Sequence, residues 1–383
     1  MAETSPISVQ PLSQRIEILA ALEPSPFPFI SLYLSLAPNQ NGREDHHQFV
    51  RKVFKDRANG FSEDSPERQS FDKDAERILQ YLESAIPPST NGLAVFASAG
   101  SEVFEAIPLE APFENHSLFI DSVPHLYPLA KLIDTYPRYA AVMLDTNKAR
   151  IFVFGGQEER QEQIVGEKTR RTSKGGWSQA RYQRRADNFH MLHIKEVVDT
   201  LDKIVREDNI DRIVVAGADV AMPILREHLP KHLADKIVEI GAHEDGESGS
   251  FVERTMAALR EKDAETDAEK VQELMDAWQS GGLGVAGPEA TLSAFQLGQV
   301  DELIITSTPE LLKNVQQLPD DAVPGEVKAD TSAPQGTADE KRLRLADELV
   351  TRAHQTSARI RFIEDENLLA GIGGVGALLR FRI

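Results

Sequence analysis

The chain has 383 residues, which is enough for two or three domains, because single hydrophobic cores usually stop growing below that length. Its 61 acidic and 42 basic residues give a formal net charge of −19, which argues against nucleic-acid binding over the whole surface and confines any such contact to a local site. Cysteine is absent, and this excludes disulfides, thiolate metal sites and cysteine nucleophiles.

The first region, residues 1–133, is predicted to be a mixed α/β domain. A helix is expected after the start signal Ser65-Pro66, because apolar residues then recur at helical spacing until Pro87. Residues 29–36 alternate between apolar and polar side chains as a half-buried strand does. Two further strands are expected around Gly100, at residues 93–97 and 103–107.

The central region, residues 134–280, is predicted to form a mixed sheet with covering helices. A hairpin of two strands, a strand–helix–strand unit and a long charged connector helix follow one another. The strongest helix carries one apolar stripe at i, i+3, i+4 and i+7 spacing. In chain order the expected segments are strands 139–144 and 149–154, the helix with Ile194 to Val205, strand 212–217, the helix with Ile224 and Leu225, strand 237–240 and helix 252–279.

The last region, residues 281–383, is predicted to be a smaller α/β sandwich. Its expected elements are helix 289–297, strand 303–306, helix 341–353 and strands 359–363 and 376–381. Residues 318–340 are rich in Pro, Asp, Ala, Ser, Thr and Gly, so a flexible surface insertion is expected there. The fold class is therefore α/β with three domains.

The central region carries a basic glycine loop at residues 168–185. This segment has seven basic residues and no acidic one, so it is suited to neutralising several RNA phosphates. Gly175-Gly176 allows close approach of the backbone to a crowded target, and Trp177 could stack on a base. The residues expected to bind RNA are Lys168, Arg170, Arg171, Lys174, Arg181, Tyr182, Arg184 and Arg185.

The loop resembles the Gly-Gly-Gln-Ser-x-x-Arg-Phe-x-Arg loop of archaeal and eukaryotic class-1 release factors, and it is similar to the loops of Pelota-type and Vms/Ankzf-type relatives and of bacterial release-factor-like proteins. Six positions carry the resemblance: Gly175, Gly176, Ser178, Arg181, Tyr182 and Arg184. The order of elements around the loop also fits that family's central domain, and the C-terminal region ending at Phe381 resembles its third domain. The resemblance extends over roughly residues 135–383.

The resemblance implies a peptidyl-tRNA hydrolase with its catalytic loop at Gly175, Gly176, Trp177 and Ser178. In that mechanism a main-chain N–H at the third position stabilises the developing oxyanion. Trp177 retains this N–H, but it replaces the family's glutamine and lacks the carboxamide that positions water. No Asn-Ile-Lys-Ser motif occurs in the first region, which argues against codon-specific termination and favours rescue of stalled ribosomes.

Three functions remain open at this stage. The first is a peptidyl-tRNA hydrolase acting in the peptidyl-transferase centre, with ribosomal RNA and tRNA as partners. The second is a non-catalytic ribosome-binding rescue or hibernation factor that occupies the A site. The third is a nuclease that cleaves tRNA near its acceptor end. Delivery by a translational GTPase is left open by the sequence.

Other motifs are interpreted structurally. His190 and His193 could share a helix face, but no third metal ligand is near, so no metal is expected and flanking histidines with satisfied hydrogen bonds are favoured. Gly371-x-Gly373-x-x-Gly376 is interpreted as a turn before a strand, not as a dinucleotide site, and no cofactor is expected. No signal-peptide pattern or apolar run of membrane-spanning length is present, so a cytoplasmic location without membrane contact is expected.

Overall fold

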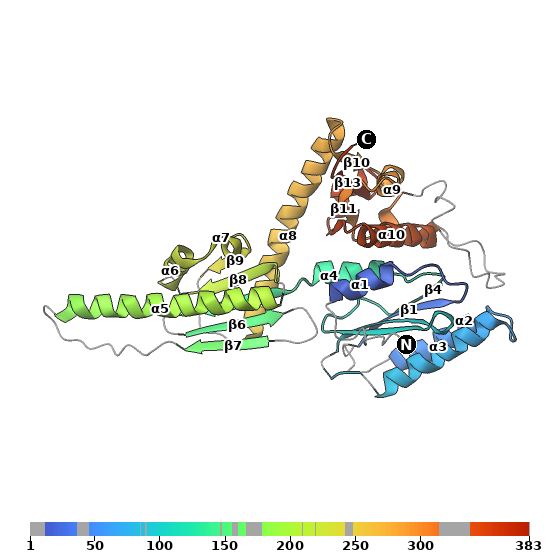
Figure 1. The fold of residues 1–383 in the computed structure, drawn as a ribbon, viewed down its shortest axis with the longest axis horizontal. Coiled ribbons are helices and arrows are strands. Elements are labelled where there is room, and N and C mark those ends of the chain that lie inside the picture. The colour runs from blue at the N-terminus through green and yellow to red at the C-terminus, as the bar shows by residue number, and fades with distance from the viewer. Residues whose placement is uncertain are drawn as a thin grey trace, which may run out of the picture. The chain divides into compact units, whose positions relative to one another are not determined.

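The structure is a computed structural model (Figure 1). It describes residues 12–36, 46–84, 86–88, 90–145, 148–154, 160–165, 178–208, 210–218, 220–241, 248–313 and 338–382. The chain divides into two compact units, which we call the terminal unit (residues 1–136 and 267–383) and the central unit (residues 137–266). The predicted α/β class is confirmed, since three separate sheets are flanked by helices. The domain boundaries at 133/134 and 280/281 stay a prediction.

The N-terminal part of the terminal unit is built on an antiparallel sheet with the strand order β3-β2-β1-β4. Helices α2 and α3 cover one face, where Ile30, Leu32 and Leu34 of β1 point. Phe29 and Tyr33 of β1 point to the other face, toward α1 and α4. The elements are α1 (Leu12–Ala20), β1 (Phe29–Ser35), α2 (His46–Ala58), α3 (Pro66–Ser84), β2 (Gly92–Ser98), β3 (Val103–Leu109), β4 (Ser117–Asp121) and α4 (Tyr127–Thr135).

One expectation for this sheet is wrong, because β1 is buried on both faces and not on one. Its polar positions are hydrogen-bonded inside the protein. The Ser31 hydroxyl accepts from the backbone N–H of His125 at 3.0 Å, and the Tyr33 hydroxyl donates to the His125 carbonyl. Alternation of polar and apolar residues therefore marks two different buried environments here, since polar side chains are tolerated in a core when they are hydrogen-bonded.

Asp74 of α3 is a buried carboxylate at the end of β2. It is fully buried, and its Oδ2 accepts from the backbone N–H of Ala99 at 2.7 Å. Burial raises the pKa of Asp74 to about 6, against the hydrogen bond from Ala99 and the charge of Arg77, which lower it. Because the folded protein binds this proton more tightly than the unfolded chain, Asp74 contributes stability at low pH that is lost as the pH rises through about 6.

We therefore expect Asp74→Asn to be more stable than the parent protein at neutral pH, by up to about 3 kcal/mol. The amide keeps the acceptor for Ala99 and carries no charge. Urea unfolding between pH 4 and pH 8 tests this, with the exposed Asp72→Asn as the control. The parent and Asp72→Asn should lose stability relative to Asp74→Asn as the pH rises. Parallel pH profiles for all three proteins would contradict the prediction.

The C-terminal part of the terminal unit has a second sheet, with the strand order β10-β13-β11-β12. β11 and β12 run parallel, and the other pairs are antiparallel. Leu303 and Ile305 pack with α9 and α10 on one face, and Ile304 packs with Val271 and Leu274 of α8 on the other. The elements are β10 (Gly284–Ala286), α9 (Pro288–Gln296), β11 (Val300–Thr306), α10 (Ala338–Gln355), β12 (Arg359–Ile363), α11 (Glu366–Ala370) and β13 (Val375–Leu379).

The expected insertion at residues 318–340 falls mostly outside the described residues. Its last part is corrected, because α10 begins at Ala338, so residues 338–340 are helical. Apart from Asp339, residues 338–343 are good helix formers, so the helix extends backward from the apolar stripe on which the prediction relied. The glycine motif before β13 is confirmed as a turn, since Gly373 and Gly374 have φ values of 82° and 85°, which favour glycine.

The two parts of the terminal unit share one hydrophobic core. Side chains of α1 and α4 pack in the same cluster as side chains of α9, α10 and β11. Polar contacts cross this boundary as well: the Tyr127 hydroxyl donates to the Thr306 carbonyl at 2.9 Å, and the backbone N–H of Phe362 donates to Asp134 at 3.2 Å. Segments at opposite ends of the sequence are thus held together by both apolar and polar contacts.

The central unit contains a five-stranded mixed sheet with the strand order β7-β6-β5-β8-β9. The predicted hairpin is confirmed, with Tyr139 opposite Phe154, and so is the strand–helix–strand unit, in which β8 and β9 run parallel; β5 also pairs in parallel with β8. Helices α5 and α6 cover one face, and Leu259 of α8 packs on the other. The elements are β5 (Tyr139–Leu144), β6 (Lys148–Phe154), β7 (Arg160–Val165), α5 (Ser178–Glu207), β8 (Arg212–Gly217), α6 (Ala221–His228), α7 (Lys231–Ala234), β9 (Ile237–Gly241) and α8 (Ser248–Gln279).

Candidate nucleic-acid interface

The candidate interface is the segment between β7 and α5 of the central unit. Lys168, Arg170, Arg171, Lys174, Gly175, Gly176 and Trp177 lie outside the described residues. Ser178, Arg181, Tyr182, Arg184 and Arg185 lie in α5, whose backbone is described over these positions. The structure therefore defines the helix that carries the second half of the predicted site, and the first half stays a prediction.

Helix α5 begins earlier than the apolar stripe indicates. Residues 178–185, assigned to the loop from the sequence, form its first turns. The reason is local: Ala180, Gln183 and the arginines are good helix formers, and Ser178 is a residue type favoured at helix starts. The sequence signal used for the helix was apolar periodicity, which starts only at Ile194. Helix propensity over 178–185 was the signal that could have found the true start.

The C-terminal half of α5 holds the helix on the sheet. Ile194, Val197, Val198, Leu201, Ile204 and Val205 are all buried and form one cluster with β5, β6, β8 and α6. Burial of such side chains is worth roughly 1.5–3 kcal/mol each, so this half is firmly anchored. Figure 1 shows the N-terminal half of α5 running beyond the ends of β6 and β7.

Helix geometry fixes how far the predicted RNA-binding positions lie from this anchor. At 1.5 Å per residue, Ser178 is about 24 Å along the helix axis from Ile194. Arg181, Arg184 and Arg185 are separated by three and four residues, so their backbone positions share one side of α5. A rigid helix thus carries a group of basic positions away from the sheet that anchors it.

The N-terminal end of α5 is electrostatically suited to an anion. Unpaired backbone N–H groups and the helix dipole make a helix start positive. The first turn contains no acidic residue to offset this charge. In the sequence, the segment that precedes α5 contributes further positive charge through its basic residues. Positive charge in an otherwise acidic chain is therefore concentrated at the junction of this segment with α5.

His193 is a buried residue of α5 itself. The residues that the structure describes contain no group of three or more histidine, aspartate or glutamate side chains placed to hold a metal ion. The expectation of satisfied hydrogen bonds is wrong for His193, whose ring nitrogens make none of normal geometry with described residues. Burial lowers the pKa of this imidazole, although the Lys148 backbone and the charge of Glu196 act against that shift. A neutral imidazole packed in the core is the result.

Two family models match the chain over adjoining segments. Residues 124–261 match bacterial archaeo-eukaryotic release factor family 10, and residues 264–383 match eRF1 domain 3. Peptide chain release factor subunit 1 of Methanocaldococcus jannaschii is 24% identical over 305 residues, which cover 74% of this chain and 71% of that protein. The same factor of Archaeoglobus fulgidus is 22% identical over 339 residues, covering 80% and 82%.

Several solved structures of translation factors align with the chain at low identity and low TM-score. The crystal structure of the archaeal translation termination factor aRF1 is 16% identical with a TM-score of 0.24, and the match covers 97% of this chain and 96% of that one. A model of ribosome-bound archaeal Pelota and ABCE1 is 14% identical with a TM-score of 0.41, covering 97% and 94%. Dom34 of Saccharomyces cerevisiae is 11% identical with a TM-score of 0.38, covering 76% and 80%.

The mixed central sheet with its long α5 and the family match over the same residues define a release-factor-like protein. Residues 124–261 are similar to the bacterial family 10 of archaeo-eukaryotic release factors, and residues 264–383 are similar to the third domain of eRF1. The resemblance expected from the loop sequence is thus confirmed. Among the described residues, no helix is both long and apolar enough to cross a membrane.

Proposed function

We propose that this protein binds the ribosome, places the segment around Gly175 and Gly176 at the acceptor end of a tRNA, and hydrolyses the ester bond of peptidyl-tRNA in rescue of stalled ribosomes. The observation that carries the proposal is the family 10 match over residues 124–261, which includes the six loop positions shared with release factors. The described geometry supports it, because α5 carries Arg181 and Arg184 on a helix anchored at its far end.

The proposed chemistry needs few protein side chains. Water attacks the ester carbonyl carbon, the bond to the ribose oxygen breaks, and the proton released by water is taken up by that oxygen. The products are a free peptide carboxylic acid, which loses its proton to solvent, and a tRNA with an intact hydroxyl end. The backbone N–H of Trp177 would donate to the developing oxyanion, and the paired glycines would let the backbone approach. Arg181, Arg184 and Arg185 would hold phosphates of the acceptor stem.

A second function is favoured by one specific observation. Trp177 stands where release factors have glutamine, so the side chain that positions the attacking water is missing. An indole can stack on a terminal base, a contact worth roughly 1–3 kcal/mol. The alternative is therefore a factor that occupies the A site in rescue or hibernation without cleaving the ester. In both proposals the partners are ribosomal RNA and tRNA, with delivery by a translational GTPase as a further proposal.

Peptide release from ribosomes carrying labelled peptidyl-tRNA tests the first proposal. We expect Gly175→Ala/Gly176→Ala to reduce the release rate by about 100-fold, the effect of removing an oxyanion contact. Co-sedimentation with ribosomes should be unchanged in this variant. Arg181→Ala/Arg184→Ala/Arg185→Ala should instead weaken ribosome binding and flatten its salt dependence.

The outcomes separate the proposals. Equal release by the parent and the glycine variant, with normal ribosome binding, would remove the hydrolase and leave the non-cleaving factor. A tRNA product shortened at its acceptor end would identify a nuclease instead. Ribosome binding that is unaffected by the arginine substitutions would contradict the assignment of this interface.

A further inference from the structure

His193 is a buried titratable side chain of α5 that takes no part in the proposed reaction. It is 4% exposed, and neither of its ring nitrogens has a hydrogen-bond partner of normal geometry among the described residues. Its neighbours in the helix, Ile194 and Val197, are apolar and buried. A leucine would fill the same place without two buried polar atoms that lack such partners, which are unfavourable. Stability alone therefore does not account for a histidine at this position.

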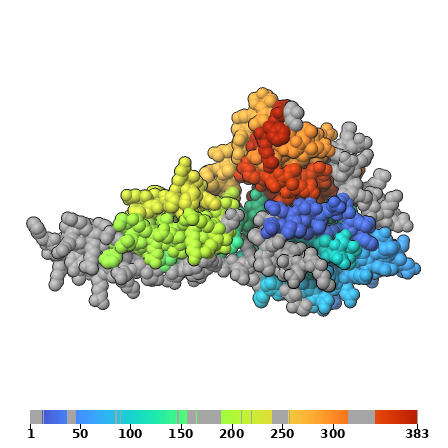
Figure 2. All heavy atoms as spheres, viewed as in Figure 1, coloured from blue at the N-terminus to red at the C-terminus, as the bar shows by residue number. Residues whose placement is uncertain are grey.

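His193 lies where α5 begins to pack on the sheet. On the loop side of it, residues 189–191 are half-buried and Leu192 is 55% exposed, so His193 is the first buried side chain among those described in α5. From Ile194 onward the apolar stripe is held in the core of the central unit. Figure 2 shows the described side chains of α5, in light green, at the surface of this unit beside those of α6 and α7, in yellow. His193 is thus the point about which the loop-bearing half of α5 can tilt.

Burial has the largest effect on this imidazole and lowers the pKa of His193 below its ordinary value. Two elements modify that effect. In the β5–β6 hairpin, the backbone of Lys148 and the charge of Asp145 raise the pKa. Within α5, the charge of Glu196 also raises it, whereas His190 lowers it. Because the net pKa is lowered, the neutral ring stabilises the fold at neutral pH, and this contribution is lost as the pH falls through the lowered pKa.

The surroundings of His193 do not suit a charged ring. An imidazolium has two N–H donors and needs an acceptor for each of them. The described residues around the buried ring present no acceptor of normal geometry. A buried charge without such partners is strongly unfavourable. The protonated ring can therefore find acceptors only by moving out to water, and this movement would loosen the first packed turn of α5.

We infer that His193 is a proton-sensitive pivot of α5: its neutral imidazole holds the helix on the β5–β6 hairpin, and its protonation frees the half of α5 that carries the loop. Ser178 lies fifteen residues before His193, which is about 22 Å along the helix. A tilt of about 20° would move it by about 8 Å, far more than the roughly 1 Å that matters for the alignment of reacting groups. The consequence for activity rests on the proposed function, since acid would withdraw the loop from the tRNA end.

The distance between two spin labels tests the inference in the full-length protein without ribosomes. The chain has no cysteine, so Gln183→Cys on the loop-bearing half of α5 and Glu227→Cys at an exposed position of α6 give the only two labels. Between pH 7.5 and pH 5.0 we expect the mean distance or the width of its distribution to change by about 5 Å, as a tilt of about 20° would produce at position 183.

Variants of the same doubly labelled protein assign this change to one ring. His193→Leu and His193→Gln cannot be protonated, so both should keep at pH 5.0 the distances that the parent has at pH 7.5. His190→Gln is the matched control, because His190 is half-buried and lies one turn away on the same helix. It should keep the full response to pH.

Three results would overturn the inference. The first is the same distance distribution at both pH values in the parent. The second is an undiminished response in both His193 variants, which would assign the movement to another group. The third is a wide distribution at both pH values in both variants, which would show that the ring only fills space. Peptide release at pH 7.5 is measured separately, so failure of the hydrolase proposal is distinguished from failure of the pivot.

Discussion

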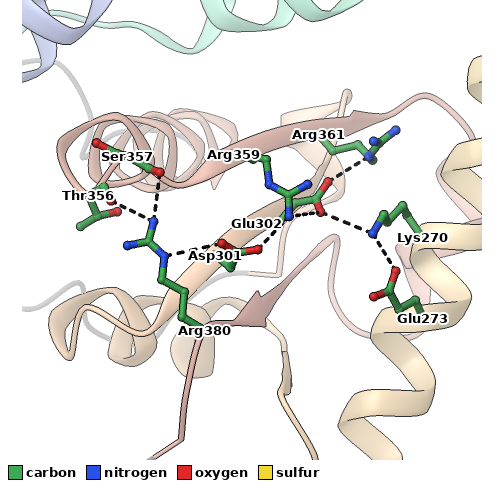
Figure 3. Close-up of polar contacts among 9 residues, drawn as sticks. All are labelled: Lys270, Glu273, Asp301, Glu302, Thr356, Ser357, Arg359, Arg361 and Arg380. Carbon is green, nitrogen blue, oxygen red and sulfur yellow. Dashed lines mark hydrogen bonds and ion pairs between the residues drawn. The ribbon is translucent and has the colours of Figure 1, made fainter. Parts of the chain in front are cut away.

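Glu302→Ala is expected to destabilise the folded protein by about 3–5 kcal/mol, the cost of removing one partner from a buried group of charges. Glu302 is 2% exposed and stands among three cations from two elements (Figure 3). Its Oε2 lies 3.2 Å from Arg359 and 3.7 Å from Lys270, and its Oε1 accepts from Arg361 at 3.2 Å. Without this carboxylate the three cations would repel one another, and two of them, Lys270 and Arg361, have side chains that are only 25% and 22% exposed.

The position of Glu302 explains the size of the effect. Arg361 also donates to Asp267 of α8 at 3.1 Å, so Glu302 and Asp267 together tie β12 to α8. Burial lowers the pKa of Arg361, but its hydrogen bonds to Asp267 and Glu302 outweigh this, and the net pKa lies above the ordinary value. In the variant the guanidinium keeps Asp267 but loses its second carboxylate partner.

Guanidinium chloride unfolding of the full-length protein measures this change. Glu273→Ala is the matched control, because Glu273 pairs with the same Lys270 at 2.7 Å but is 56% exposed. The control should lose less than about 1 kcal/mol, as exposed ion pairs do. Similar losses in both variants would show that burial of Glu302 does not determine its contribution.

How much of this fold the sequence predicts depends on how each segment is stabilised. The helix with Ile194 to Val205 and the strand 212–217 are confirmed, because their apolar pattern is itself the main stabilising contact. Helices α1, α2 and α4 and strands β4 and β10 were not predicted. α2 has only a few apolar residues among many polar ones, and β10 has three residues, so neither gives a clear period.

The sequence also did not predict that the two parts of the terminal unit share one core. Leu129 of α4 and Leu349 of α10 are fully buried in one cluster, yet more than 200 residues separate them. Periodicity shows which side of each helix is apolar, but not which distant helix covers it. For the candidate site the residues were found from the sequence, but their contacts were not. The type and spacing of a loop motif selected Gly175, Gly176, Arg181 and Arg184, and the contacts of these residues with RNA are still a proposal.

Asp347→Ala is expected to destabilise the protein by about 4 kcal/mol, because Asp347 joins the two parts of the terminal unit. This residue of α10 is 6% exposed. Its Oδ1 accepts from the backbone N–H groups of Leu126 and Tyr127 at 2.6 Å and 2.9 Å, which are the first donors of α4. No side chain of α4 itself caps this helix. Alanine would leave two buried donors unpaired at the positive end of a helix, each costing roughly 1–3 kcal/mol.

His125 makes the loss larger than that of a helix cap alone. Its Nδ1 lies 3.4 Å from Asp347 Oδ2, and its ring stacks on Phe119 at a centroid distance of 4.5 Å. Burial raises the pKa of Asp347 above its ordinary value, although His125 and the two backbone donors act against that shift. Alanine removes the carboxylate that α10 provides to the start of α4, although other contacts, such as the hydrogen bond from Tyr127 to the Thr306 carbonyl, still join the two parts.

The variant Asp347→Asn removes the negative charge of the side chain but keeps its hydrogen-bond acceptor. Its amide oxygen can still accept from Leu126 and Tyr127, and its NH₂ group can donate to His125 Nδ1. We expect this variant to differ from the parent protein by at most about 1 kcal/mol in urea unfolding, against a loss of about 4 for alanine, because removal of the buried charge offsets the lost contact with His125. Hydrogen exchange should report faster opening of the α4 amides in Asp347→Ala than in Asp347→Asn. Equal unfolding free energies and equal α4 exchange in the two variants would show that the acceptor at position 347 does not hold the two parts together.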